Sequence, residues 1–144
     1  MTLLRIGLLP TILSVICGCG SEPAGPAIAP VTGLVTFDGA PVADADISFI
    51  PEDVRATPAQ AVTNAAGQFE VISVFDQGRT TRPGMVPGQY NVEIRLLKAA
   101  PAGAGRLEAP RNTLPEKYAS ATTSGLQINV TLDGENHFEL QMTK

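Results

Sequence analysis

Hydrophobic residues recur at every second position in three stretches toward the end of the chain, each separated from the next by a break in the pattern. A period of two is typical of a β-strand that buries one face and exposes the other to water. Four earlier stretches show the same alternation less cleanly. The pattern predicts strands over residues 31–37, 46–50, 60–64, 68–74, 90–96, 126–132 and 138–142.

Turn residues separate these predicted strands. Asp38-Gly39, Pro87-Gly88 and Asp133-Gly134 supply side chains that tolerate positive φ or preset a turn. Asp133-Gly134 stands between two alternating stretches and predicts a hairpin there. Because no window shows a sustained 3.6-residue apolar stripe, helix is expected only for about one turn near residues 115–118. We therefore expect an all-β sandwich of about seven strands.

The longest break in the alternation spans residues 98–124 and opens with alanine, proline and glycine. Loops of this length are uncommon in compact domains and are often binding loops or disordered segments. Leu114 and Tyr118 are the large apolar residues within residues 114–118, so we expect their side chains to pack against the sandwich and hold the loop in place. A second irregular stretch is expected over residues 76–87.

The N-terminus has the anatomy of a bacterial signal peptide. A single basic residue, Arg5, precedes an uncharged apolar run over residues 6–16. As a helix this run would reach about 16 Å, roughly half of the ~30 Å hydrocarbon core, so it is too short for a finished membrane anchor. The residues that follow, Ile16-Cys17-Gly18-Cys19, resemble the bacterial lipobox. We expect a signal peptide over residues 1–18, cleavage between Gly18 and Cys19, and lipid on the sulfur of Cys19.

The two cysteines could instead form a disulfide or pack in a helix. A disulfide between positions two apart is strained by the geometry that such bonds prefer, so lipid on Cys19 is the favoured interpretation. Cleavage would remove Cys17 and leave no free thiol and no disulfide. The stability of the mature protein must then come from its core.

Small residues and prolines fill residues 20–30, which cannot bury enough apolar surface to offset their ordering entropy. We expect a flexible tether over residues 19–30 and a single folded domain over residues 31–144, since the length suits one modest core. Gly20 stands where an aspartate would retain a lipoprotein at the inner membrane under the enterobacterial sorting rule. The expected location is therefore outside the cytoplasm, lipid-anchored to the cell envelope at the outer membrane.

Four short motifs follow one another at suitable spacing. They are Gly33-Leu34-Val35, the run DGAPVADADI over residues 38–47, TNAAGQF over residues 63–69, and Pro87-Gly88-Gln89-Tyr90. Together they resemble the carboxypeptidase regulatory-like domain family over about residues 31–97. Further along, residues 114–118 and 123–126 are similar to the version of that domain found on small bacterial lipoproteins.

The resemblance implies a transthyretin-like or prealbumin-like Greek-key sandwich and no activity. Such domains resemble non-catalytic companions of larger proteins that stabilise, space or bind, and the family has no catalytic residues to carry over. The chain departs from the family at Asn64, where aspartate is usual. Asparagine also suits a turn, but the change weakens any calcium role for that position.

Catalysis has few candidate residues. His137 is the only histidine and is expected on the exposed face of its strand with Glu139. A zinc hydrolase would need at least two histidine or cysteine ligands, and we expect no metal site. A Ser-His-Asp arrangement would need a nucleophile elbow, and none surrounds the candidate serines Ser48, Ser73, Ser120 and Ser124.

Two further enzyme classes also find little support in the sequence. Transthyretin-related hydrolases of 5-hydroxyisourate need several histidines and a Tyr-Arg-Gly-Ser end, whereas this chain ends LQMTK. Spacing alone does not exclude paired carboxylates for glycoside hydrolysis, but the 14 acidic residues are spread along the chain. We expect no catalytic residue and no cofactor.

Charge divides the chain into two oppositely biased parts. The net charge of −4 argues against a nucleic-acid partner. A basic loop surface could face phospholipid headgroups or acidic glycan, and acidic loops could weakly hold a divalent cation; solvated loops with incidental bias are the simpler interpretation. The acidic run comprises Asp38, Asp44, Asp46, Glu52 and Asp53, and the basic part spans Arg79 to Lys117, including Arg82.

Two functional hypotheses follow. In the first, the protein is a non-catalytic, membrane-anchored lipoprotein whose sandwich is a structural or binding module with an envelope protein or polysaccharide as partner. In the second, it is an enzyme or a hydrolase-type enzyme subunit with its site in the 98–124 loop. A deep pocket lined by convergent acids or by His137 would favour catalysis, and a shallow surface with solvated loops would favour the module.

Overall fold

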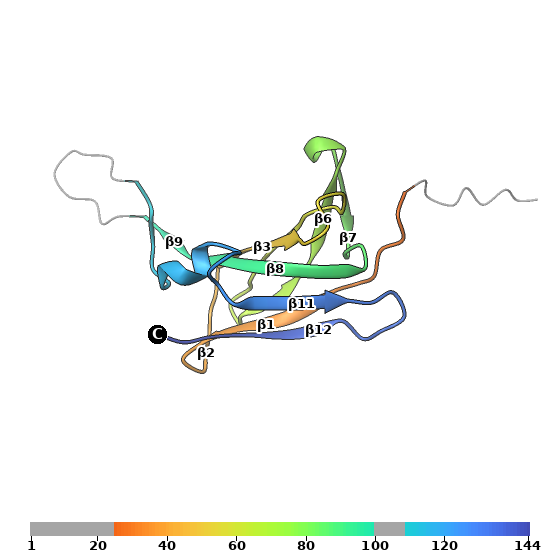
Figure 1. Ribbon diagram of the computed structural model, residues 1–144. Helices are drawn as coiled ribbons and strands as arrows, with labels where there is room; N and C mark the ends of the chain where they lie inside the picture. Colours follow the sequence, from red (N-terminus) through yellow and green to blue (C-terminus); the bar gives the residue numbers. More distant parts are fainter. Residues whose placement is uncertain (1–24, 100–108) are drawn as a thin grey trace, which may run out of the picture.

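Two packed β-sheets make up the computed structural model, which describes residues 25–99 and 109–144 (Figure 1). The larger sheet has six strands in the order β11-β8-β3-β4-β6-β7, and all its neighbours are antiparallel. Its strands are β3 (Asp46–Pro51), β4 (Ala59–Val62), β6 (Ile72–Phe75), β7 (Thr80–Pro83), β8 (Gly88–Arg95) and β11 (Leu126–Val130).

The smaller sheet is built around β1 (Thr32–Phe37). The last strand of the chain, β12 (His137–Met142), runs parallel to β1 along one edge. The short strands β2 (Ala40–Pro41) and β5 (Gln68–Glu70) pair antiparallel with β1. A two-stranded ribbon of β9 (Leu97–Lys98) and β10 (Arg111–Asn112) and two single-turn 3₁₀ helices, η1 (Asp76–Gly78) and η2 (Glu116–Ala119), complete the described elements.

The core lies between the sheets and is filled by the inward-facing half of each alternating strand. Phe49 on β3 is fully buried, and its ring centroid lies 6.0 Å from that of Phe69 on β5, so this pair joins the two sheets. Tyr90, Val92 and Ile94 bury the inner face of β8. Stability therefore rests on apolar burial between the sheets. The all-β sandwich expected from the two-residue period is confirmed.

One predicted strand is two strands. Every second residue over residues 68–74 is buried, namely Phe69, Val71 and Ser73, so the alternation runs through the whole stretch. However, β5 pairs with β1 in the smaller sheet, whereas β6 pairs with β4 in the larger one. The period of two reports which face is buried and carries no information on the pairing partner, so the change of sheet at Val71 left no trace in the sequence.

The hairpin predicted at Asp133-Gly134 is wrong. β11 pairs with β8 and β12 pairs with β1, so the connection crosses from one sheet to the other. Gly134 does not adopt the positive φ that a type I′ hairpin turn would need. Instead, the buried Asn136 fixes the crossing: its Oδ1 accepts a hydrogen bond from the Thr131 N–H at 3.0 Å, and its Nδ2 donates to the Thr131 carbonyl at 2.9 Å.

Both stretches expected to be irregular carry short structure. Strand β7 and η1 lie within residues 76–87, and β10 and η2 lie within the described part of 98–124. The single helical turn expected near residues 115–118 is confirmed as η2. Leu114 and Tyr118 are both buried, as predicted. The Tyr118 hydroxyl donates to the Thr143 carbonyl at 3.1 Å, which ties the loop to the end of the chain.

The Pro87-Gly88-Gln89-Tyr90 motif forms a corner at the start of β8. The Tyr90 hydroxyl donates a hydrogen bond to the carbonyl of Val86, four residues upstream, at 2.7 Å. A tyrosine that bonds back across such a corner is a recurrent feature of β-sandwiches. The motif therefore has a structural role, which is to hold the turn that leads into β8, in the middle of the larger sheet.

The two tyrosines of the chain are expected to ionise in a fixed order. Burial raises the pKa of Tyr90. Burial acts in the same direction on Tyr118, but its hydrogen bonds with Thr143 and the nearby charge of Lys117 together lower its pKa. Alkaline titration followed by tyrosinate absorbance should show two transitions, and Tyr90→Phe should remove the higher one.

The raised pKa of Tyr90 also determines how its contribution to folding stability changes with pH. Because the pKa of Tyr90 is raised in the folded state, its contribution is fully present below the usual tyrosine pKa of about 10 and is lost as pH rises through the folded value. Loss of the lower transition in the Tyr90→Phe protein would contradict the assignment.

Candidate functional site

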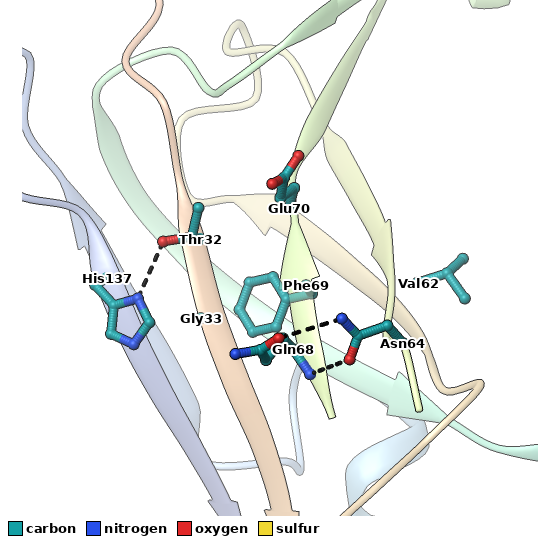
Figure 2. A pocket seen from close by; sticks show the side chains of 8 residues that line it. All are labelled: Thr32, Gly33, Val62, Asn64, Gln68, Phe69, Glu70 and His137. Carbon is teal, nitrogen blue, oxygen red and sulfur yellow. Dashed lines mark hydrogen bonds between the residues drawn. The ribbon is translucent and has the colours of Figure 1, made fainter. Parts of the chain in front are cut away.

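The described residues include an open hollow on the outside of the smaller sheet, with a volume of about 490 Å³ (Figure 2). Strands β1, β5 and β12 supply most of its lining, and the β4–β5 turn supplies one side. The lining residues are Thr32, Gly33, Val62, Asn64, Gln68, Phe69, Glu70 and His137.

Strand register sets the polar side chains in a row across the hollow. Thr32 on β1 is paired with His137 on one neighbouring strand and with Glu70 on the other. All three are exposed, because alternate residues of each strand face away from the core. The order across the sheet is therefore glutamate, threonine, histidine.

Gly33 and Phe69 form the floor of the hollow. The Phe69 side chain points into the core beneath Gly33, and a Cβ built on Gly33 would lie 2.5 Å from the Phe69 ring. Glycine is thus required here by the close approach of the ring, while its φ is ordinary for any residue. The first motif of the sequence, Gly33-Leu34-Val35, gains a physical explanation from this contact.

His137 lies on the exposed face of β12, as predicted, and its Nδ1 is 3.0 Å from the Thr32 hydroxyl oxygen. A nucleophile–base pair also needs a third group that orients the histidine. The nearest carboxylate in the row, Glu70, lies on the far side of Thr32 from the ring. Within residues 25–99 and 109–144, His137 forms no hydrogen bond with a carboxylate, and no three His, Cys, Asp or Glu side chains cluster to hold a metal ion.

The four candidate serines lie elsewhere in the fold. Ser73 is buried in β6 and donates to the Gly84 carbonyl at 2.8 Å, and the buried Ser124 accepts from the Leu126 N–H at 3.2 Å. Ser120 pairs with the hydroxyl of Thr122. Ser48 is on β3, in the other sheet. In the part of the chain that the structure describes, none of the four hydrogen-bonds to His137.

Asn64 holds the turn at one side of the hollow. Its Oδ1 accepts from the N–H groups of Ala66 at 2.9 Å and Gln68 at 3.0 Å, and its Nδ2 donates to Gln68 Oε1 at 3.3 Å. An aspartate could accept the same two backbone bonds, so the departure from the family pattern preserves the turn. The same oxygen is committed to backbone N–H groups, which weakens further any role in holding a cation.

Several charged residues are engaged locally. Arg55 and Asp53 form an exposed ion pair at 3.3 Å. The backbone N–H of Arg55 and then its side chain lower the pKa of Asp53. Arg95 pairs with Glu93 at 3.5 Å and donates to the Ala119 carbonyl at 2.9 Å. Such pairs contribute little stability, and they leave less free charge than the sequence suggested for a basic docking face.

Two basic residues, Arg82 on β7 and Lys117 on η2, also have local partners. Arg82 lies 5.6 Å from the Phe75 ring centroid and donates to the Pro26 carbonyl at 3.2 Å. Lys117 lies 4.9 Å from the Tyr118 ring centroid. These two cations therefore brace a loop and a chain segment, which fits the simpler interpretation of solvated loops with incidental charge bias.

The chain was compared with known protein families, curated proteins and solved structures. No protein-family model, no curated protein and no solved structure matches it. The resemblance to the carboxypeptidase regulatory-like family thus rests on the four motifs and stays a prediction. Among the described residues, no helix is long and apolar enough to cross a membrane. Cys19 and Gly18, the predicted lipid and cleavage sites, lie outside the described residues.

Most of the hollow was not predicted from the sequence. His137 was predicted on the exposed face of its strand, where the structure has it, but Thr32, Gln68 and Glu70 were not predicted to be its neighbours. Each of these is the polar member of an alternating strand, so the pattern marked it as exposed. Their meeting depends on the parallel pairing of β1 with β12, which the pattern does not encode.

Proposed function

We propose that the protein is a lipid-anchored lipoprotein whose sandwich is a non-catalytic, carboxypeptidase regulatory-like module of the cell envelope. The lipobox-like Ile16-Cys17-Gly18-Cys19 after an uncharged apolar run supports export and anchoring through Cys19. Gly20, two residues past the predicted cleavage site, supports sorting to the outer membrane.

One observation carries the non-catalytic assignment. The only histidine of the chain faces the open hollow, and the carboxylate of its row is on the wrong side of Thr32 to orient the ring. The imidazole therefore lacks the orienting carboxylate of a Ser-His-Asp arrangement within the described residues. An open surface of exposed polar side chains suits contacts with an envelope protein or a polysaccharide.

Replacing the predicted lipid-carrying residue tests the anchoring. In the native host, Cys19→Ser is expected to abolish palmitate incorporation and leave the protein uncleaved, because serine has no thiol to acylate. Cys17→Ser is the matched control, two residues away, and should be labelled and cleaved like the wild type. Metabolic labelling and mass spectrometry of the N-terminus measure both. Palmitate on the Cys19→Ser protein would overturn the proposal.

Affinity capture of the lipidated protein from its own envelope tests the module. We expect a protein or polysaccharide to copurify, and Gln68→Ala with His137→Ala to weaken its retention. Capture of a defined enzyme would make the module a subunit of that enzyme. A hydrolytic activity of the isolated protein that depends on His137 would refute the non-catalytic assignment.

A further inference from the structure

The chain joins the sandwich at one defined end. Ala29 is buried and exchanges two backbone hydrogen bonds with Met85, both at 2.8 Å. Further back, the Pro26 carbonyl accepts from Arg82 at 3.2 Å. Residues of the expected tether are thus held against the segment between β7 and β8. After the proposed cleavage, six residues, Cys19 to Ala24, would precede Gly25, and six residues span at most about 20 Å when fully extended.

Three loops meet at this end, which we call the tether end: residues 52–57, 84–87 and 131–136. The Glu52 N–H donates to the Gln89 carbonyl at 3.1 Å, so the first loop lies beside the start of β8. Val130, the last residue of β11, is paired with Gly88, so the third loop begins at the same level. Figure 1 shows the first described residues, from Gly25 onward, and the β11–β12 connection on the same side of the molecule.

Two of these loops each expose a large apolar side chain. Val54 is 94% exposed and Leu132 is 51% exposed. Neither side chain contributes to the core. Leu132 also belongs to an alternating stretch that predicted its burial, and the crossing held by Asn136 turns it outward instead. An exposed apolar residue on a loop, within tether reach of a bilayer, is placed to meet a lipid interface.

The charge of the tether end selects the kind of lipid. Its exposed acids are Glu52, Asp53, Asp133 and Glu135. Its cations are Arg55, which is paired with Asp53, and the half-buried Arg82, which donates to the Pro26 carbonyl, so acids outnumber cations. An anionic surface would repel this end within a Debye length, whereas a zwitterionic surface would not. We propose that the tether end is the lipid-facing surface of the anchored protein, with Val54 and Leu132 contacting a zwitterionic phospholipid interface. This inference rests on the proposed lipid anchor.

The chain contains no tryptophan, so a single introduced indole gives a clean signal. Val54→Trp and Leu132→Trp report on the tether end. Leu97→Trp is the matched control, because Leu97 is 52% exposed and lies just past the other end of β8. An eight-residue strand separates the two ends by about 27 Å.

The full lipidated chain is reconstituted into zwitterionic phosphatidylcholine vesicles that contain brominated acyl chains. Tryptophan at positions 54 and 132 is expected to lose emission and to shift to shorter wavelength, while tryptophan at position 97 keeps its emission. Replacing part of the lipid with phosphatidylglycerol should weaken the quenching at low salt. Equal quenching at all three positions, or none at 54 and 132, would overturn the inference.

Mass spectrometry of the same samples separates the two proposals. If Cys19 carries lipid and the quenching pattern fails, the orientation is wrong and the anchor stands. If Cys19 carries no lipid, the anchor itself has failed.

Discussion

Replacing Gly33 by alanine is expected to lower the free energy of unfolding by about 3 kcal/mol, and replacing it by valine to prevent folding. The added Cβ would overlap the Phe138 carbonyl oxygen and lie 2.5 Å from the Phe69 ring. Neither neighbour can withdraw easily. The carbonyl belongs to β12 in the paired sheet, and the ring packs against Phe49 in the core.

Urea unfolding followed by circular dichroism measures this effect. Gly39→Ala is the control, because Gly39 has a φ of +84° and nothing within 4 Å of an added Cβ. That change should cost only about 1–2 kcal/mol, through backbone conformation alone. If Gly33→Ala were no more destabilising than Gly39→Ala, the close packing of the hollow's floor would be refuted.

Replacing Phe49 by alanine is expected to cost about 3–5 kcal/mol, comparable to the whole stability of many small domains. Phe49 is fully buried on β3 and contacts Phe69 of the other sheet. The truncation would leave a cavity where the two sheets meet. The described residues contain no cysteine, so no disulfide there compensates, and the loss should appear as a large fall in the urea midpoint.

Val54→Ala is the matched control for this substitution. Val54 is 94% exposed, and its truncation should change the free energy of unfolding by less than about 0.5 kcal/mol. A similar destabilisation by both substitutions would mean that β3 does not bury Phe49 in the core.

The fold class could be predicted because burial in a sheet has a two-residue period. Tyr90, Val92 and Ile94 are buried as the pattern predicts, and so are Leu140 and Met142. Pairing could not be predicted, since a strand's hydrophobic pattern is the same whichever neighbour it bonds to. For this reason the prediction of a hairpin at Asp133-Gly134 was wrong.

The candidate site was predictable only in part, and for the same reason. Thr32 and His137 are 105 positions apart in the sequence, yet they share a hydrogen bond across two paired strands. The exposure of His137 followed from its place in the alternation. Its partner, and the position of Glu70 beyond that partner, depend on the order of strands in the sheet.

The pairing of β1 with β12 also constrains how the protein is made. A chain that emerges with its N-terminus first exposes β1 early, but the residues that cover one edge of that strand come last, at His137–Met142. Until they arrive, an unpaired edge stays open to other chains. Contacts between the two ends of a sequence also slow folding. Completion of the smaller sheet therefore waits until β12 has been synthesised, and chains cut short before β12 are the ones most exposed to proteolysis and aggregation.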